Sequence, residues 1–313
     1  MASNHDLPPL DWVGWRETAL HLQLMTQIVG KVRIAHTPWL NHGWHVALYP
    51  TAHGLDTGPI PAPGGSIQIN FDLLGDALYL ASDRGETRTV PLKPGSIADF
   101  HAAVMAALDD LGAPTRIAGM PNEMADPVAF AEDYAVRPYD GDAVRRFHSA
   151  LLFATDGFKQ FRTGFIGKAS PVHFFWGSFD LAVTRFSGRA APQHPGGVPG
   201  LPDAVTREAY SHEVSSAGFW PGSDAYPHAA FYSYAYPSPA GFADAPVRPD
   251  AARFDAGLGE FLIDYEAVRT APDPAAALAE FLESTYEAAA NLAEWDRDAL
   301  ECAPGSPRIP RKV

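Results

Sequence analysis

The sequence predicts an α+β protein made of two halves, each with a helix, several strands and a closing helix. Four segments carry apolar residues at helical spacing. The segments between them alternate apolar and polar residues or are rich in β-branched and aromatic residues, as strands are. Turns marked by Gly and Pro join consecutive strands, which favours mainly antiparallel sheets. We place the halves at residues 1–125 and 126–313 and expect them to pack around a shared interface pocket. One continuous domain is the alternative.

The helical segments are identified by their apolar stripes and their end signals. The second begins at Ser96, with Asp99 three residues later as in a capping box, and stops at Gly112. The fourth has Asp273 as its N-cap and Pro274 at the first helical position. The predicted helices cover residues 17–31, 96–112, 141–163 and 273–295.

Eight strands are predicted from short runs with strand periodicity and from the turn signals between them. They cover residues 44–49, 66–71, 77–80, 87–90, 172–176, 209–216, 229–236 and 260–265. Two segments rich in Pro and Gly, 187–203 and 237–250, are expected to be long loops. The break between the halves is expected in the stretch 114–138.

Composition argues against several classes of function. The formal net charge is −14 and the isoelectric point is about 5.2, which argues against binding nucleic acid or an anionic membrane. No apolar run reaches the roughly 20 residues needed to span a bilayer, and we expect no signal peptide. Cys302 is the single cysteine, so zinc sites built from several thiolates are excluded within one chain. We therefore expect a cytoplasmic protein, and the sequence does not predict its oligomeric state.

Cationic and aromatic residues are concentrated in residues 165–189, FIGKASPVHFFWGSFDLAVTRFSGR. In an acidic chain, three cations this close together point to an anionic ligand such as a carboxylate or a phosphate. Ion pairing with some of the 37 acidic residues is the alternative. The residues expected to bind the substrate are Lys168, Arg185, Arg189, Trp176 and Tyr234, the last from a row of tyrosines on one face of strand 229–236.

Histidines and carboxylates on the predicted strands are candidates for catalysis or metal binding. If His45, His173 and His212 converge, they form a three-imidazole site for a divalent metal such as iron, zinc or copper. His212 and Glu213 are expected on opposite faces of their strand, because strand side chains alternate. The predicted catalytic residues are His173, His212, Asp180 and Glu213. Core histidines bonded to the backbone are the alternative.

Three longer blocks of the sequence resemble one known family. They are FIGKASPVHFFWGSFDLAVTRFSGR, REAYSHEVSSAGFWPG and STYEAAANLAEWDR. They are similar to the hallmark blocks of a bacterial family catalogued as domain-of-unknown-function family 5996, and the likeness extends from near Trp15 to Leu300. The resemblance implies a soluble bacterial protein, and it implies no particular activity, cofactor or catalytic residue.

These patterns favour a cytoplasmic enzyme that acts on a small anionic organic molecule through a site of histidines and carboxylates. An oxidoreductase, a hydrolase and a lyase all fit, with or without a divalent metal. Two other interpretations stay open. A non-catalytic sensor or carrier would use the same pocket, and a partner-binding protein would use an exposed aromatic surface.

Overall fold

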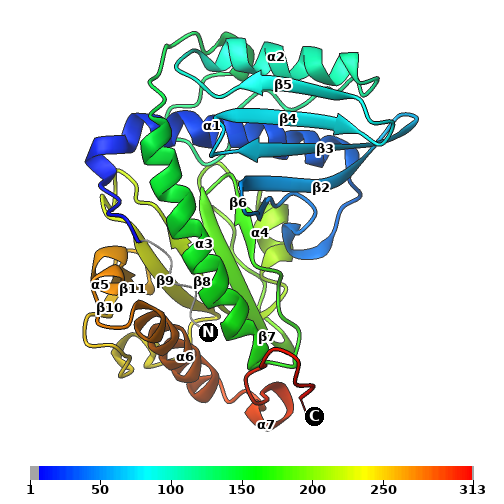
Figure 1. Ribbon diagram of the computed structural model, residues 1–313. Helices are drawn as coiled ribbons and strands as arrows, with labels where there is room; N and C mark the ends of the chain where they lie inside the picture. Colours follow the sequence, from blue (N-terminus) through cyan, green and yellow to red (C-terminus); the bar gives the residue numbers. More distant parts are fainter. Residues whose placement is uncertain (1–6, 312–313) are drawn as a thin grey trace.

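Two antiparallel sheets form the framework of the computed structural model, which describes residues 7–311 (Figure 1). The first sheet has the strand order β1-β2-β3-β4-β5, and the second has the order β10-β11-β9-β8-β7-β6. The first sheet consists of β1 (Tyr49–Pro50), β2 (Gly54–Ala62), β3 (Gly65–Asp72), β4 (Ala77–Ser82) and β5 (Thr87–Pro91). The second sheet consists of β6 (His173–Phe175), β7 (Asp180–Ala190), β8 (His212–Trp220), β9 (Ala230–Tyr236), β10 (Arg253–Asp255) and β11 (Glu260–Asp264).

Helices cover both sheets and connect them. α1 (Trp12–His36) and α2 (Ile97–Asp110) contact the first sheet, and α6 (Pro274–Leu292) contacts the second. α3 (Gly141–Thr163) is the long green helix of Figure 1, and it runs from the first sheet down to the second. The short helices are α4 (Asp203–Ala209), α5 (Tyr265–Arg269), α7 (Arg297–Leu300), η1 (Asn41–Gly43), η2 (Phe130–Glu132) and η3 (Phe242–Asp244).

The two sheets meet where the segment before β1 reaches β6. Leu48 and Phe174 exchange two backbone hydrogen bonds there, of 2.9 and 2.7 Å. One continuous cluster of buried apolar side chains includes residues of both sheets and of α1, α2, α3 and α6. Each half therefore completes its core with side chains of the other half.

The predicted α+β class with mainly antiparallel sheets is confirmed. α3 has the predicted bounds, and α2 has the predicted cap, because the Ser96 hydroxyl accepts a hydrogen bond from the backbone N–H of Asp99. At the start of α6, Asp273 accepts one from the N–H of Ala276. α1 is longer than predicted at both ends.

The predicted strand 44–49 is wrong. His42 and Gly43 have left-handed φ angles of +59° and +69°, and Trp44 is helical, with φ −65° and ψ −18°. An extended strand cannot pass through such residues, so the chain turns here instead. Only Tyr49 and Pro50 pair with β2, as β1, and Leu48 pairs with Phe174, whereas His45 lies before these residues.

Three strands were not predicted. β2 contains Pro59 and Pro61, and proline cannot donate a backbone hydrogen bond to a neighbouring strand. Both are tolerated because β1 pairs only with residues nearer the start of β2, so one edge of β2 has no partner strand at these prolines. β7 runs through the block 165–189 and continues into the segment expected to be a loop, and β10 is only three residues long. The predicted strand 209–216 begins too early, because Asp203–Ala209 form α4.

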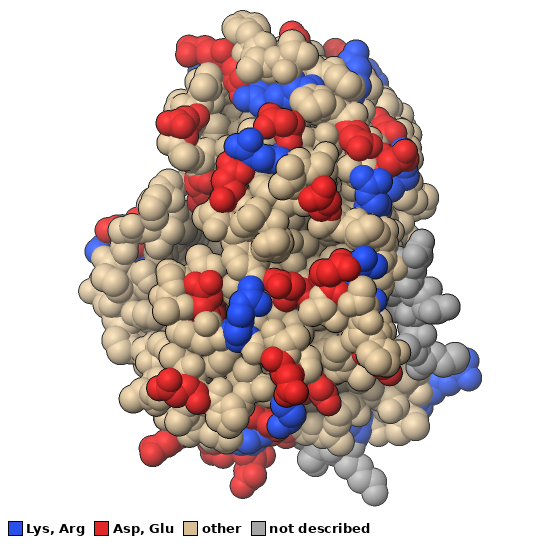
Figure 2. Space-filling view, turned by 90° about the vertical axis from the view of Figure 1, so that its left-hand side faces the viewer, with Lys and Arg blue, Asp and Glu red and all other residues tan. Residues whose placement is uncertain are grey.

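Two features of the described residues bear on membranes and nucleic acids. No helix within residues 7–311 is long and apolar enough to span a bilayer. On the face shown in Figure 2, Lys and Arg side chains stand among Asp and Glu side chains rather than in one basic area. Nucleic-acid binding normally uses a continuous basic surface, and this face offers none.

Candidate functional site

The second sheet has one apolar and one polar face. The apolar face packs on α3 and α6 through buried side chains such as Leu181, Val183 and Phe219. Because side chains alternate along a strand and paired residues share a face, the register defines the opposite side. We call that side the polar face, and it carries Lys168, His173, Asp180, Thr184, His212, Ser216, Trp220, Tyr232, Tyr234, Tyr236 and Glu260.

Asp180, the first residue of β7, is a buried carboxyl on the polar face and is 6% exposed. It accepts hydrogen bonds from the hydroxyls of Tyr232 and Ser178. Burial raises the pKa of the Asp180 carboxyl, and these two hydrogen bonds oppose that shift. Gly218 makes the Tyr232 contact possible, because a Cβ there would lie 2.2 Å from the tyrosine ring and hydroxyl.

Glu123 approaches Asp180 from the segment that connects the two halves. Its φ is +55°, a conformation that a residue other than glycine keeps only when its surroundings hold it. The preceding residue, Asn122, is held by Gln27 of α1, which donates to its carbonyl oxygen at 2.9 Å and accepts from its N–H at 2.7 Å. Lys31, one turn further along α1, donates to the Asn122 side chain. α1 therefore positions Glu123.

The Glu123 carboxyl lies against Gly177, in the turn before β7. A Cβ on Gly177 would be 2.1 Å from a carboxyl oxygen of Glu123, so this close approach requires glycine. Gln23 of α1 donates to the carbonyl oxygen of Gly177 at 2.7 Å and holds the turn. Burial, with a smaller effect from the Asp180 charge, raises the pKa of Glu123 to about 7.

Glu260 and two more tyrosines extend this group along the polar face. Burial, followed by the charges of Asp180 and Asp255, raises the pKa of Glu260 to about 8. The Tyr234 hydroxyl lies 2.8 Å from that of Tyr210, which follows α4. These residues are half-buried, so the group keeps contact with solvent. We call the group the carboxyl–tyrosine cluster, and its members are Glu123, Asp180, Tyr210, Tyr232, Tyr234 and Glu260.

The carboxyl–tyrosine cluster is suited to proton transfer. Carboxyls with pKa values of about 7 and about 8 exchange protons near neutral pH, where their acid and base forms coexist. Neighbouring carboxyls with different pKa values divide the roles of acid and base. Within residues 7–311, no Lys or Arg forms an ion pair with Glu123, Asp180 or Glu260, so no cation neutralises them directly.

Lys168 and His42 form a second polar group further along the same face. The Lys168 Nζ lies 2.7 Å from Nε2 of His42, and Nδ1 of His42 lies 2.8 Å from the carbonyl oxygen of Ala209. The His212 ring is 6.2 Å from the His42 ring. The backbone of Lys168 bonds to Phe186 of β7, which places the Lys168–His42 pair beyond the carboxyl–tyrosine cluster along that strand.

The polar face contains five of the residues predicted for the site. Asp180 and Tyr234 belong to the carboxyl–tyrosine cluster, and Lys168 and His212 lie around His42. His173 is 1% exposed on β6, next to the rings of Phe175 and Trp44. The catalytic and binding roles of these residues stay predictions.

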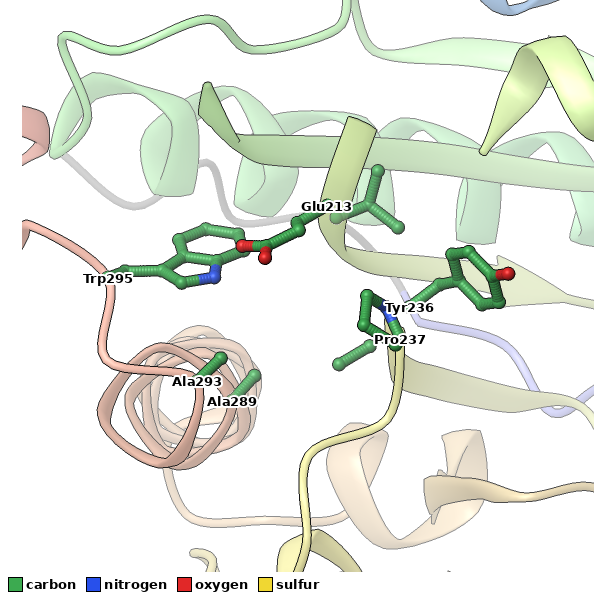
Figure 3. Close-up of a pocket in the computed structure, with 8 residues that line it drawn as sticks. Glu213, Tyr236, Pro237, Ala289, Ala293 and Trp295 are labelled. Atoms are coloured by element: carbon green, nitrogen blue, oxygen red, sulfur yellow. The ribbon is translucent and has the colours of Figure 1, made fainter. Parts of the chain in front are cut away.

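Three other predicted residues lie on the side of the sheet that packs on the helices. Glu213 binds Arg189 at 2.7 Å and accepts from the Ser187 hydroxyl at 2.8 Å. Figure 3 shows Glu213 in a small pocket beside Trp295 and α6. His212 and Glu213 therefore have the opposite orientations that strand alternation predicts. Arg189 also donates to the backbone carbonyls at the end of α6.

Arg185 is a structural cation and does not join Lys168 in one anion site. Its side chain is 1% exposed and pairs with Glu283, with N···O distances of 3.2 and 3.3 Å. Its guanidinium carbon lies 3.4 Å from the ring centroid of Phe161 and 4.3 Å from that of Tyr286. The expected convergence of three cations does not occur, because Arg185 and Arg189 point to the opposite side of the sheet from Lys168.

The three histidines of the expected metal site are also separate. His45 packs on Trp39 and bonds to the backbone of Leu40, whereas His212 lies near His42. Burial and the charge of Arg162 lower the pKa of His173 to about 3, so His173 is neutral. Within residues 7–311, no three His, Cys, Asp or Glu side chains are grouped so that they could hold a metal ion.

Trp176 is a packing residue between the two halves. It is 5% exposed, and its indole N–H donates to the carbonyl oxygen of Val46 at 2.9 Å. The ring lies directly on Gly30 of α1, where a Cβ would come within 2.0 Å of the indole nitrogen. This contact explains an aromatic residue at the position without a bound ligand.

A family model matches residues 7–302, nearly the whole chain. The chain belongs to DUF5996, a family of unknown function. The resemblance indicated by the three sequence blocks is therefore confirmed. Comparison with curated proteins and with solved structures gives no match. The activity has to be inferred from the geometry of the site, because neither fold nor family supplies one.

Sequence reasoning missed Glu123, Tyr210, Glu260 and His42 as site residues. Glu123 lies in a segment without regular structure, and only its contacts with α1 bring it to the polar face. One signal for this arrangement exists in the sequence. Gln23, Gln27 and Lys31 are spaced four residues apart in a helix that is otherwise largely apolar, and such a polar stripe indicates polar partners.

Proposed function

We propose that the protein is an enzyme that transfers protons to and from a small organic molecule at the carboxyl–tyrosine cluster. The main support is the group formed by Asp180, Tyr232 and Glu123, in which a buried carboxyl accepts hydrogen bonds from two hydroxyls and from its own backbone N–H, has no Lys or Arg partner among residues 7–311, and lies near a second carboxyl. Purely structural buried carboxylates are normally paired with Lys or Arg. The pKa values of about 7 and about 8 for Glu123 and Glu260 suit an acid or base that works near neutral pH.

The two glutamates have different roles in this proposal. Glu123 has the lower pKa of the two, about 7, so Glu123 is the proton acceptor. Glu260 has the higher pKa and is mostly protonated, so it is the proton donor. Asp180 accepts the hydroxyl hydrogen of Tyr232 and thereby orients that ring.

A paired proton donor and acceptor favours hydrolysis or elimination, because both reactions take one proton from the reactants and give another to the leaving group. Recognition of an anion has less support. Arg185 and Arg189 are bound to Glu283 and Glu213, which leaves Lys168 as the one predicted cation on the polar face. Three carboxyls without cations favour a neutral or positively charged substrate.

An activity screen with matched variants tests the proposal. Wild type, Glu123→Gln and Asp180→Asn are compared on p-nitrophenyl esters and glycosides, on amides, and on neutral 3-hydroxy ketones as elimination substrates. We expect turnover by the wild type and a loss of roughly 10²-fold or more in both variants. The control is Glu280→Gln on the exposed side of α6, which should keep full activity.

Three results would contradict this function. Turnover that persists in both variants would place the chemistry elsewhere. A carbon-13 NMR titration needs no substrate, and Glu123 titrating in the ordinary glutamate range would remove the acid–base role. Calorimetric binding of a panel compound that is never converted, and that Glu123→Gln abolishes, would support the non-catalytic binding protein instead.

A further inference from the structure

Lys168, His42 and Ala209 form a hydrogen-bonded chain that the proposed carboxyl chemistry does not use. Nζ of Lys168 is 2.7 Å from Nε2 of His42, and Nδ1 of His42 is 2.8 Å from the Ala209 carbonyl oxygen. A carbonyl oxygen only accepts hydrogen bonds, so Nδ1 carries the hydrogen and Nε2 presents its lone pair to Lys168. Lys168, His42 and the Ala209 carbonyl therefore have the order of nucleophile, base and orienting group that enzymes use to activate a nucleophile.

Aromatic rings rather than carboxylates surround the Lys168 nitrogen. It lies 4.7 Å from the ring centroid of Phe186 and 5.3 Å from that of Trp44. No Asp or Glu within residues 7–311 forms an ion pair with it. Burial lowers the pKa of Lys168, which increases the fraction of neutral amine near pH 7. Lys168 nevertheless keeps an exposed surface, so a ligand can reach it.

His42 is held in a conformation that keeps its ring beside Lys168. It is 6% exposed, its φ is +59°, and the end of α4 anchors it through the Ala209 carbonyl. Burial lowers the pKa of His42, and the charges of Lys168 and His212 act in the same direction. The bond to Ala209 and the charge of Glu208 oppose this shift. The imidazole is therefore neutral at pH 7 and can accept a proton.

We propose that Lys168 is a reactive amine that forms an imine with an aldehyde or ketone, with His42 as the proton acceptor. The neutral amine attacks the carbonyl carbon, the C=O π bond breaks as the C–N bond forms, and His42 passes one proton from the nitrogen to the oxygen. The oxygen takes a second proton from solvent and leaves as water when the C=N bond forms, and the nitrogen releases its remaining hydrogen to solvent. One water is released per imine, and nothing is oxidised or reduced. The rings of Trp44 and Phe186 favour a planar carbonyl compound.

Reductive trapping on the full-length protein tests this site. Benzaldehyde and sodium cyanoborohydride are added at pH 7, and the labelled lysines are identified by peptide mass spectrometry. Lys93 and Lys159 are exposed on the same chain and serve as internal references. We expect Lys168 to be labelled at least about tenfold faster than either reference, because burial lowers its pKa and His42 lies within reach of its nitrogen as a proton acceptor. Lys168→Arg keeps the charge but forms no imine, so it should lose the fast label.

The role of His42 is tested by His42→Asn, because Asn tolerates a left-handed φ and lacks the imidazole. This variant should lower the labelling of Lys168 to the rate of Lys93. Equal rates at Lys168, Lys93 and Lys159 in the wild type would overturn the proposal. A folded His42→Asn protein that still labels Lys168 fast would overturn the role of the base. Circular dichroism shows whether the variant is folded. If it is not, the labelling rates of Lys168, Lys93 and Lys159 in the wild type still test the reactive lysine.

Discussion

Asp180 and Arg185 lie on the same strand, β7, but on opposite faces of the second sheet. Both are almost completely buried, with exposures of 6% and 1%. Arg185 is matched by Glu283, by a backbone carbonyl and by aromatic rings. Asp180 accepts hydrogen bonds from two hydroxyls and its own backbone N–H, and the charged groups near it are carboxyls. Burial alone therefore does not show whether a charged residue is structural, whereas an oppositely charged partner, as at Arg185, indicates that it is.

The largest effect is expected for Arg185→Ala. The change removes the cation that lies against the rings of Phe161 and Tyr286 and leaves a cavity on the apolar face. We expect the free energy of unfolding to fall by about 3 kcal/mol, as for other large-to-small changes at buried, paired positions. Urea denaturation measures this loss.

Asp180→Asn is the matched change on the polar face. No cation loses its partner, so we expect a loss below about 1 kcal/mol in the same urea experiment. Arg88→Ala, which breaks a pair of exposed side chains 3.2 Å apart, is the surface control and should cost less than about 1 kcal/mol. If Asp180→Asn costs as much as Arg185→Ala, the contrast between the two faces is wrong.

Gly218→Ala should have the next largest effect, because it disturbs the contact between Tyr232 and Asp180. The new Cβ would lie 2.2 Å from the Tyr232 hydroxyl and 2.5 Å from the Leu181 carbonyl oxygen. Backbone cannot move away as a flexible side chain can, so we expect a loss of about 2 kcal/mol in thermal unfolding. Gly119→Ala is the control, because a Cβ there meets nothing within 4 Å. Equal melting temperatures for the two variants would argue against a tightly packed polar face.

The smallest effect is a pH dependence carried by Glu123. A carboxyl whose pKa is raised on folding binds its proton more tightly in the folded state. Stability is therefore lost as the pH rises from the ordinary value of 4.5 through about 7. Glu123→Gln removes this loss, so the variant should match the wild type at pH 5 and exceed it by about 1 kcal/mol at pH 8, a value reduced by solvent screening at this half-buried site.

Urea denaturation at the two pH values measures the effect of Glu123→Gln. Glu280→Gln, on the exposed side of α6, should show no pH-dependent difference from the wild type. A difference between Glu123→Gln and the wild type that is the same at pH 5 and pH 8 would mean that Glu123 has an ordinary pKa.

The parts of the fold that were predicted correctly depend on local rules. α3 follows from the recurrence of Val144, Phe147 and Leu151 at helical spacing, and the cap of α2 follows from Ser96. Strand alternation likewise separated His212 from Glu213 without knowledge of their neighbours.

The parts that were not predicted depend on contacts between distant segments. Pro59 and Pro61 are compatible with β2 only because no strand pairs with that edge. The position of Glu123 depends on hydrogen bonds across 95 residues between Gln27 and Asn122. Arg185 resembled a ligand-binding cation until Glu283 of α6 proved to be its partner. No spacing rule along the chain contains this information.

The hydrogen bonds from α1 to Asn122 and Gly177 also have a consequence for the order in which the site assembles during synthesis. α1 leaves the ribosome before Asp180, Tyr232 and Glu260, which follow it in the sequence. A nascent chain that has reached only the end of β7 holds Glu123 and Asp180 but lacks Tyr232 and Glu260. The carboxyl–tyrosine cluster is therefore complete only when translation has passed β11, and an unfinished chain carries no assembled site.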